Sequence, residues 1–408
     1  MYNFADYVKR ASLFVNNNFN SSNKKLSTFM IYATDLCDSG CKHCLIWAKN
    51  PVVHLPKAKI LELMNSKCVT KNTTVGLEGG EFLLHPEAFE IMEWFHKNHP
   101  KFDLLTNCLK PESAIEAVKK YPPKRLFLSL DGTKETYKYM RGKDGYESVL
   151  KVIEGTKDIV PISAMFTLSP YNSFDDMKHV AAVCKKYGID LRVGVYNDIA
   201  FFDTVEKAHE TDIAEKQNTD ILKRVEILNA KKDGTFTKKN EELAVLEREE
   251  INIPKHNTRD DFSSFKDSIP QEIKEFAENY DFLVLYDEWR KKKLKLNCYS
   301  ILDSLIVLPN GDVPICQNLD LKLGNVNKKS LDEIFNGEST QAIHEDYKKN
   351  CNQCWINFHR KYDVVLYRSF EKFFPKNVVN KLFGYYQWEE NNEVTYSNYM
   401  ERIEDTYK

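Results

Sequence analysis

The sequence predicts an α/β fold in which helices cover a parallel sheet, followed by a smaller cysteine-rich unit. Strand and helix signals alternate between residues 29 and 198, and six such units in succession are typical of a parallel sheet with outer helices. Polar and sulfur-containing side chains directly follow several of the strands. Four further cysteines gather around a hairpin signal, Asn310-Gly311, in a pattern that metal-binding units use.

Each expected strand is a short run of apolar or β-branched residues, and each expected helix carries apolar residues at helical spacing. The expected strands are 28–34, 73–77, 101–106, 125–130, 161–168 and 190–196. The expected helices are 55–66, 86–98, 111–120, 146–157 and 174–187. The cysteine loop, Glu81, Asn107 and Asp131 follow strands, so we expect them at the carboxyl edge of the sheet, where barrel enzymes place their sites.

Composition limits the class of protein. The 408 residues suffice for a barrel-sized domain and a smaller one, and the formal net charge is −2. We therefore expect no nucleic-acid partner, and no apolar run reaches the length of a membrane span. The ten cysteines, without a secretory signal at residues 1–20, favour metal ligation in a reducing, cytoplasmic compartment over disulfides.

Three cysteines near the start of the chain, Cys37, Cys41 and Cys44, have the spacing CxxxCxxC. Three thiolates on one loop can hold three irons of a [4Fe–4S] cluster and leave the fourth iron without a protein ligand. An open iron can bind S-adenosylmethionine and pass it one electron. The cleaved cofactor then supplies a 5′-deoxyadenosyl radical, which takes hydrogen atoms from unactivated C–H bonds.

A zinc site or unpaired structural thiols are the alternative interpretations of this triplet. Zinc needs a fourth ligand in tetrahedral geometry. His43 lies inside the triplet, but the adjacent residues His43 and Cys44 would chelate one ion poorly. The spacing therefore favours the cluster.

Two further segments stand at the ends of expected strands. The sequence E-G-G-E at 78–81 combines glycines, which let the backbone approach a ligand closely, with a carboxylate that can pair with an ammonium group. The sequence L-S-L-D-G at 128–132 is followed by Arg141, whose planar fork suits a carboxylate. Each segment alone is also typical of an ordinary turn.

Taken together, the three segments resemble the radical SAM enzyme superfamily. The resemblance implies an incomplete (β/α)6 barrel, a partial TIM-like barrel, with S-adenosylmethionine and the three-cysteine cluster at its open end. In the family, Gly-Gly-Glu binds the methionine amino group, and residues at the positions of Ser129 and Arg141 contact the ribose and the carboxylate. The cofactor-binding residues expected from the resemblance are His43, Gly79, Gly80, Glu81, Ser129, Asp131 and Arg141.

The second group of cysteines surrounds the predicted hairpin. Cys298 precedes an apolar run at 302–308, an Asn-Gly turn follows, and Cys316 lies on the return strand. Cys351 and Cys354 form a CxxC after a helical stretch at 330–349. A zinc ribbon and a second iron–sulfur cluster use the same four ligands, whereas a redox pair would use the CxxC alone.

This region resembles the twitch domain, the shortened form of the SPASM domain, and the segments 323–326 and 331–334 match it as well. The resemblance implies one auxiliary [4Fe–4S] cluster that takes part in electron transfer. Its expected ligands are Cys298, Cys316, Cys351 and Cys354.

Three cysteines remain. We expect Cys68 and Cys184 to be small buried side chains. Cys108 follows an expected strand, so its thiol faces the expected barrel mouth. Packing is the role that a free cysteine favours. The alternative is a catalytic role, in which the Cys108 thiol returns a hydrogen atom to a substrate radical.

The predicted segments are an N-terminal extension (1–28), the radical SAM partial barrel (29–198), a helical and loop insertion (199–296), the twitch domain (297–360) and a helical tail (361–408). The insertion could cap the substrate pocket. Its candidate contacts are Asp198, His209, His256 and Arg259, although each alone is more typical of a surface residue.

The resemblance implies hydrogen abstraction from a small polar or carbohydrate-like substrate, ending in oxidation or epimerisation. A flavodoxin or ferredoxin is the expected reductant. A peptide maturase is the alternative enzyme, although residues 1–28 are too few for the leader-binding domain that such enzymes often carry. A metal-stabilised binding protein is the non-enzymatic alternative, but a structural cluster gains nothing from an exposed iron.

Overall fold

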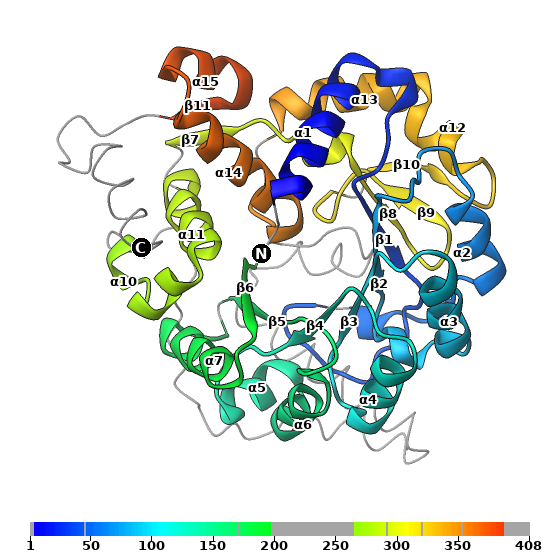
Figure 1. The fold of residues 1–408 in the computed structure, drawn as a ribbon, viewed down its shortest axis with the longest axis vertical. Coiled ribbons are helices and arrows are strands. Elements are labelled where there is room, and N and C mark those ends of the chain that lie inside the picture. The colour runs from blue at the N-terminus through cyan, green and yellow to red at the C-terminus, as the bar shows by residue number, and fades with distance from the viewer. Residues whose placement is uncertain are drawn as a thin grey trace, which may run out of the picture.

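The computed structural model describes residues 4–44, 46–169, 171–196, 265–290, 293–319, 321–351 and 354–386. Its centre is a curved seven-stranded sheet with the strand order β6-β5-β4-β3-β2-β1-β8 (Figure 1). Every strand pair in this sheet is parallel. The first six strands are β1 (Thr28–Tyr32), β2 (Thr74–Glu78), β3 (Phe102–Thr106), β4 (Arg125–Ser129), β5 (Ile162–Leu168) and β6 (Asp190–Val195). All six confirm the sequence prediction.

Helices cover the outer side of this sheet, as Figure 1 shows. Their bounds are α2 (Lys57–Met64), α3 (Ala88–Asn98), α4 (Pro111–Lys120), α5 (Lys134–Arg141), α6 (Tyr146–Thr156) and α7 (Phe174–Tyr187). Five of the six confirm predicted helices. The sixth, α5, was not predicted, because most of its residues are polar and its apolar positions are few. Thr133 begins it by accepting a hydrogen bond from the Thr136 amide, and Gly142 ends it with a left-handed backbone.

The seventh strand comes from the cysteine-rich region. Strand β8 (Ser304–Val307) pairs in parallel with β1 and so extends the barrel sheet. The chain then turns at the predicted Asn-Gly site, where the Leu308 N–H donates to the Asp312 carbonyl over 2.9 Å. Strand β9 (Asp312–Pro314) follows and pairs with β10 (Lys322–Asn325). The predicted turn is confirmed, but the strand before it belongs to the barrel sheet.

The predicted helical stretch at 330–349 forms two helices, α12 (Leu331–Asn336) and α13 (Glu338–Asn350), which Gly337 separates. Helix α14 (Asn357–Glu371) contacts α11 (Ala277–Arg290), and the Asn357 side-chain amide donates to the carbonyl of Val193 in β6. Figure 1 shows α14 between the β6 and β8 sides of the sheet. The start of the predicted tail therefore lies across the open side of the partial barrel.

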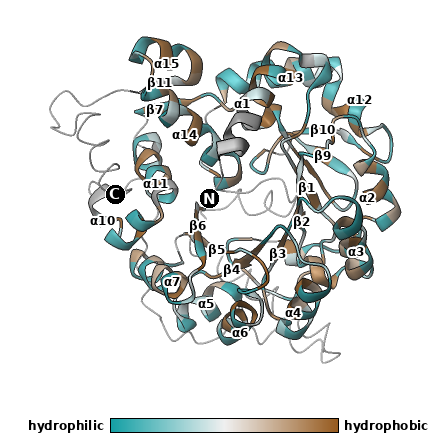
Figure 2. Cartoon of the chain, in the orientation of Figure 1, coloured by the Kyte–Doolittle hydropathy of each residue, from teal (hydrophilic) through white to brown (hydrophobic). Residues whose placement is uncertain are grey.

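The remaining elements lie around this centre. They are α1 (Phe4–Phe19), α10 (Phe265–Ser268), β7 (Leu294–Leu296), α15 (Lys376–Phe383) and β11 (Gly384–Tyr386). Strand β11 pairs antiparallel with β7. Hydrophobic and hydrophilic residues share most helices in Figure 2, as expected for helices with one buried side. Among the described residues, we find no helix with the length and apolar character needed to cross a membrane.

Candidate functional site

The cysteine loop lies directly against the Gly-Gly-Glu segment. The pairing of β1 with β2 continues beyond both strands, because Gly80 N–H donates to the Thr34 carbonyl over 2.7 Å and Glu81 N–H donates to the Leu36 carbonyl over 2.8 Å. A β-carbon on Gly80 would lie 2.4 Å from the Leu36 oxygen. The two motifs are thus parts of one structure, and the second glycine is required for their close contact.

The far end of the cysteine loop is held by α5. The Arg141 carbonyl accepts hydrogen bonds from the Gly40 amide (2.8 Å) and from the Ser39 hydroxyl (3.1 Å). The Cys41 carbonyl accepts from the Trp47 indole over 3.0 Å. These bonds fix the loop backbone that presents the three thiols.

The three thiols line one cavity, with Cys41 buried and Cys37 and Cys44 partly exposed. Burial and the neighbouring Cys41 raise the pKa of Cys37, and the same causes raise the pKa of Cys44 to about 12. Thiols in such surroundings become thiolates when a metal supplies positive charge. Among the described residues, no three His, Cys, Asp or Glu side chains are arranged to hold a single metal ion.

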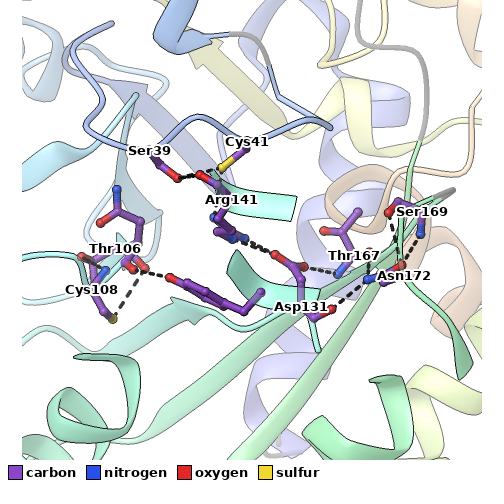
Figure 3. Close-up of polar contacts among 11 residues, drawn as sticks. Ser39, Cys41, Thr106, Cys108, Asp131, Arg141, Thr167, Ser169 and Asn172 are labelled. Carbon is purple, nitrogen blue, oxygen red and sulfur yellow. Dashed lines mark hydrogen bonds and ion pairs between the residues drawn. The ribbon is translucent and has the colours of Figure 1, made fainter. Parts of the chain in front are cut away.

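A buried ion pair connects the loop with the end of β4. Arg141 Nε donates to Asp131 Oδ2 over 2.8 Å, its Nη2 donates to the same oxygen, and its Nη1 lies 3.5 Å from Cys41 Sγ (Figure 3). Asp131 Oδ1 accepts from the Thr167 amide of β5 over 2.9 Å. Burial is the largest single influence and would lower the pKa of Arg141, but Asp131 and the neighbouring Cys41 and Tyr137 together outweigh it and leave that pKa above its ordinary value.

Glu81 is a buried carboxylate held by backbone amides. Its Oε2 accepts from the Asn107 N–H over 2.7 Å, and its Oε1 accepts from the Leu83 N–H over 3.3 Å. Burial raises its pKa to about 7, although both amide bonds oppose this change. The Glu81 carboxyl therefore has a fixed orientation, and a nearby positive group such as an ammonium would stabilise its ionised form.

A cavity of about 740 Å³ runs along the inner side of the sheet. The sequence-predicted residues in its wall are Cys37, Cys41, His43, Cys44, Gly79, Gly80, Glu81, Ser129 and Arg141. His43 Nδ1 is buried without a hydrogen-bond partner, and burial lowers the pKa of this imidazole to about 4. A neutral ring nitrogen that lacks a partner fits a bound polar cofactor at this place. Asp131 is fully buried behind Arg141 and outside the cavity wall.

Residues far along the chain complete the cavity wall. Helix α14 contributes Asn357, Phe358 and Lys361, and the region after β9 contributes Gln317. Sequence reasoning missed these residues, since none of them belongs to a chemical motif. It also missed Glu78, which stands directly before the Gly-Gly pair and could have been found from that position.

The four cysteines of the second group surround one small cavity. Cys298, Cys316, Cys351 and Cys354 line it together with Arg360 and other residues. Burial raises the pKa of Cys316 to about 12, with Cys354 and Cys351 as further causes. Arg360 is fully buried and donates to the carbonyls of Leu296 (3.0 Å) and Cys354 (3.2 Å). A fixed positive charge, which also pairs with Asp363 over 3.5 Å, thus lies beside four thiols, and such a charge would stabilise a cluster with thiolate ligands.

The other predicted residues are placed differently. Cys108 is fully buried in the hydrophobic core, does not line the cavity, and has a pKa that burial raises. Its φ of 62° is one that glycine adopts readily. This position favours packing over the predicted hydrogen donor at the barrel mouth. Cys68 and Cys184 are fully buried, as expected. Asp198, His209, His256 and Arg259 lie outside the described residues.

Solved structures of SuiB from Streptococcus suis are similar to this chain. The structure bound to S-adenosylmethionine has a TM-score of 0.51 at 14% identity and covers 84% of this chain and 74% of SuiB. A further SuiB structure has a TM-score of 0.50 at 16% identity, covering 83% and 72%. The structure bound to the precursor peptide SuiA has a TM-score of 0.49 at 14% identity, covering 84% and 72%. The TM-scores of the first two structures show a common fold. A search among curated proteins found no match.

Two family models match the chain where the two cysteine groups lie. The radical SAM superfamily model matches residues 31–184. The model of the SPASM iron–sulfur cluster-binding domain matches residues 298–355. These matches imply S-adenosylmethionine, a [4Fe–4S] cluster and auxiliary iron–sulfur binding. The chain is a radical SAM enzyme with a C-terminal iron–sulfur domain of the SPASM type.

Proposed function

We propose that the enzyme oxidises a small polar or carbohydrate-like substrate by removing one hydrogen atom and then one electron and one proton. S-adenosylmethionine, when bound and reduced, supplies the 5′-deoxyadenosyl radical that takes the hydrogen atom. Cys298, Cys316, Cys351 and Cys354 would hold the auxiliary cluster, which would provide the acceptor for the electron. Oxidation is preferred to epimerisation because Cys108, the candidate hydrogen donor, lies in the core.

One observation carries this proposal. The cysteine loop, the Gly-Gly-Glu segment and the residue after Cys316 all open into the same cavity. A substrate in that cavity would lie between the two groups of cysteines. Such a position suits a reaction that uses the first group to start the radical chemistry and the second to complete it.

The residues of the first site have separate tasks in this proposal. Cys37, Cys41 and Cys44 hold the cluster. Glu81, with both oxygens already oriented by amides, is the partner of the methionine ammonium group. Arg141 anchors the loop through its carbonyl and keeps positive charge near Cys41.

The cavity also supports the proposed substrate class. Its volume of about 740 Å³ is within the usual range for a site that holds one small ligand, roughly 300–1,000 Å³. Because the same cavity would also hold the cluster and S-adenosylmethionine, the room left for the substrate favours a small molecule. Its inner wall includes the polar side chains of Tyr32, Glu78, Asp103, Arg192 and Gln317. A ligand that can form several hydrogen bonds suits this wall better than an apolar one.

Reconstituted protein handled without oxygen provides the test. With dithionite and S-adenosylmethionine it should form 5′-deoxyadenosine. A small-molecule extract of the source organism should increase the rate of 5′-deoxyadenosine formation. Deuterated extract should transfer deuterium into that product. No 5′-deoxyadenosine would refute the proposed chemistry, and stimulation by the peptide fraction alone would favour the maturase alternative.

A further inference from the structure

Glu78 is a carboxylic acid inside the cavity that the cofactor motifs do not use. It is the last residue of β2, and its side chain lines the cavity. The carboxyl folds back over Gly76, because a β-carbon on Gly76 would lie 3.2 Å from Glu78 Oε1. Glu81, in contrast, has both oxygens bonded to backbone amides. Of these two acids in the cavity wall, Glu78 is thus the better placed to exchange a proton with a ligand.

A chain of hydrogen bonds connects Glu78 with the second group of cysteines. The side-chain amide of Gln317 donates to the Tyr32 hydroxyl over 2.9 Å, and that hydroxyl donates to the Glu78 carboxyl. Gln317 follows Cys316, and its backbone N–H donates to His359 Nε2 over 3.1 Å. In the two bonds that link Gln317 to Tyr32 and Tyr32 to Glu78, each donor points toward Glu78, so these bonds stabilise its ionised form.

The surroundings of Glu78 keep its proton affinity near neutral pH. Burial and, to a lesser extent, the charge of Asp103 raise its pKa, the Tyr32 hydrogen bond opposes them, and the resulting pKa is about 8. Tyr32 faces it from β1 and Asp103 from β3, the two strands that flank β2. A general base works best when its pKa lies near the working pH, and this carboxyl meets that condition.

We propose that Glu78 is the base that accepts the substrate proton in the oxidation, and that Tyr32 and Gln317 are positioning residues. This inference rests on the proposed function. The substrates in this class are compounds with a carbon atom that carries both a hydrogen and a hydroxyl or amino group. After the C–H hydrogen atom has left, the O–H or N–H proton passes to the Glu78 carboxylate and one electron passes to the oxidised auxiliary cluster. A C=O or C=N bond forms, and the product has lost two hydrogens.

The first test needs no substrate. Infrared spectra of the holoenzyme, taken as wild type minus Glu78→Gln across a pH series, should show a protonated carboxyl that disappears near pH 8. Tyr32→Phe removes a bond to the ionised form, so the midpoint should rise. In Gly76→Ala the new β-carbon would crowd Glu78 Oε1, so the titration midpoint of the Glu78 carboxyl should also change. A carboxyl that titrates in the ordinary acidic range, or a midpoint that Tyr32→Phe leaves unchanged, overturns the inference.

The second test uses the small-molecule fraction that stimulates 5′-deoxyadenosine formation. Glu78→Gln should lower the amount of oxidised product per 5′-deoxyadenosine by about 100-fold or more, the usual range for loss of a general base. Glu116→Gln, at an exposed carboxyl on α4, is the matched control. If Glu78→Gln and the wild type form equal amounts of oxidised product per 5′-deoxyadenosine, the role of Glu78 is refuted and the proposed function is not affected. A wild type that forms no 5′-deoxyadenosine refutes the proposed function instead.

Discussion

Replacement of Gly80 by alanine tests the contact between the two cofactor motifs. The new β-carbon would lie 2.4 Å from the Leu36 oxygen and 2.7 Å from the Asp35 oxygen, and ordinary contact begins at 3.4 Å. The backbone just before Cys37 must therefore move by about 1 Å. A displacement of about 1 Å at a reacting group can lower a rate by about 100-fold.

The assay is 5′-deoxyadenosine formation by reconstituted Gly80→Ala, with iron content measured on the same samples. We expect a rate about 100-fold below wild type, with the iron of the auxiliary site retained. Gly188→Ala is the matched control, because Gly188 has a positive φ but no atom within 4 Å of its β-carbon position. It should cost about 1–2 kcal/mol of stability and leave the rate unchanged. Equal rates for the two variants would refute the reasoning.

Three further predictions concern buried residues. Asp131→Asn leaves the Arg141 guanidinium buried without its counter-charge, so the free energy of unfolding measured in urea should fall by about 3–5 kcal/mol. Asp144→Asn, at an exposed carboxyl, is the control. An equally small effect of the two substitutions would contradict the pairing of Asp131 with Arg141. Arg360→Gln removes a positive charge beside the second cysteine group and should lower the reduction potential of the auxiliary cluster in a redox titration monitored by electron paramagnetic resonance; an unchanged potential would argue against that placement. Cys108→Ala should cost about 1 kcal/mol through a small cavity and still support substrate turnover, whereas loss of turnover with intact folding would restore the hydrogen-donor role.

The barrel strands and most of its helices could be predicted because their signals are local. Each strand is a short run whose apolar residues are buried by the outer helices, and the Asn-Gly turn has a strong local preference. The parallel pairing of β8 with β1 joins Thr28 to Ser304, 276 residues apart, and an apolar run does not specify such a partner. Helix α5 was missed because its burial depends on tertiary contacts that its polar residues do not indicate.

The candidate site was predicted in part for the same reason. The cysteines, Glu81 and Arg141 belong to short motifs with characteristic spacing. Glu78 and Gln317 belong to no motif, and their importance follows from a cavity that only the folded chain forms. The expected exposure of Cys108 assumed that a residue after a strand faces the barrel mouth, whereas its left-handed backbone turns the thiol into the core.

The electron paramagnetic resonance spectrum of the dithionite-reduced enzyme, recorded with and without S-adenosylmethionine, tests the central claim most directly. If Cys37, Cys41 and Cys44 hold a cluster with one open iron, the cofactor should change the spectrum. That change should persist in a variant whose Cys316 and Cys354 are replaced by alanine. A wild-type spectrum that the cofactor leaves unaltered would contradict the account.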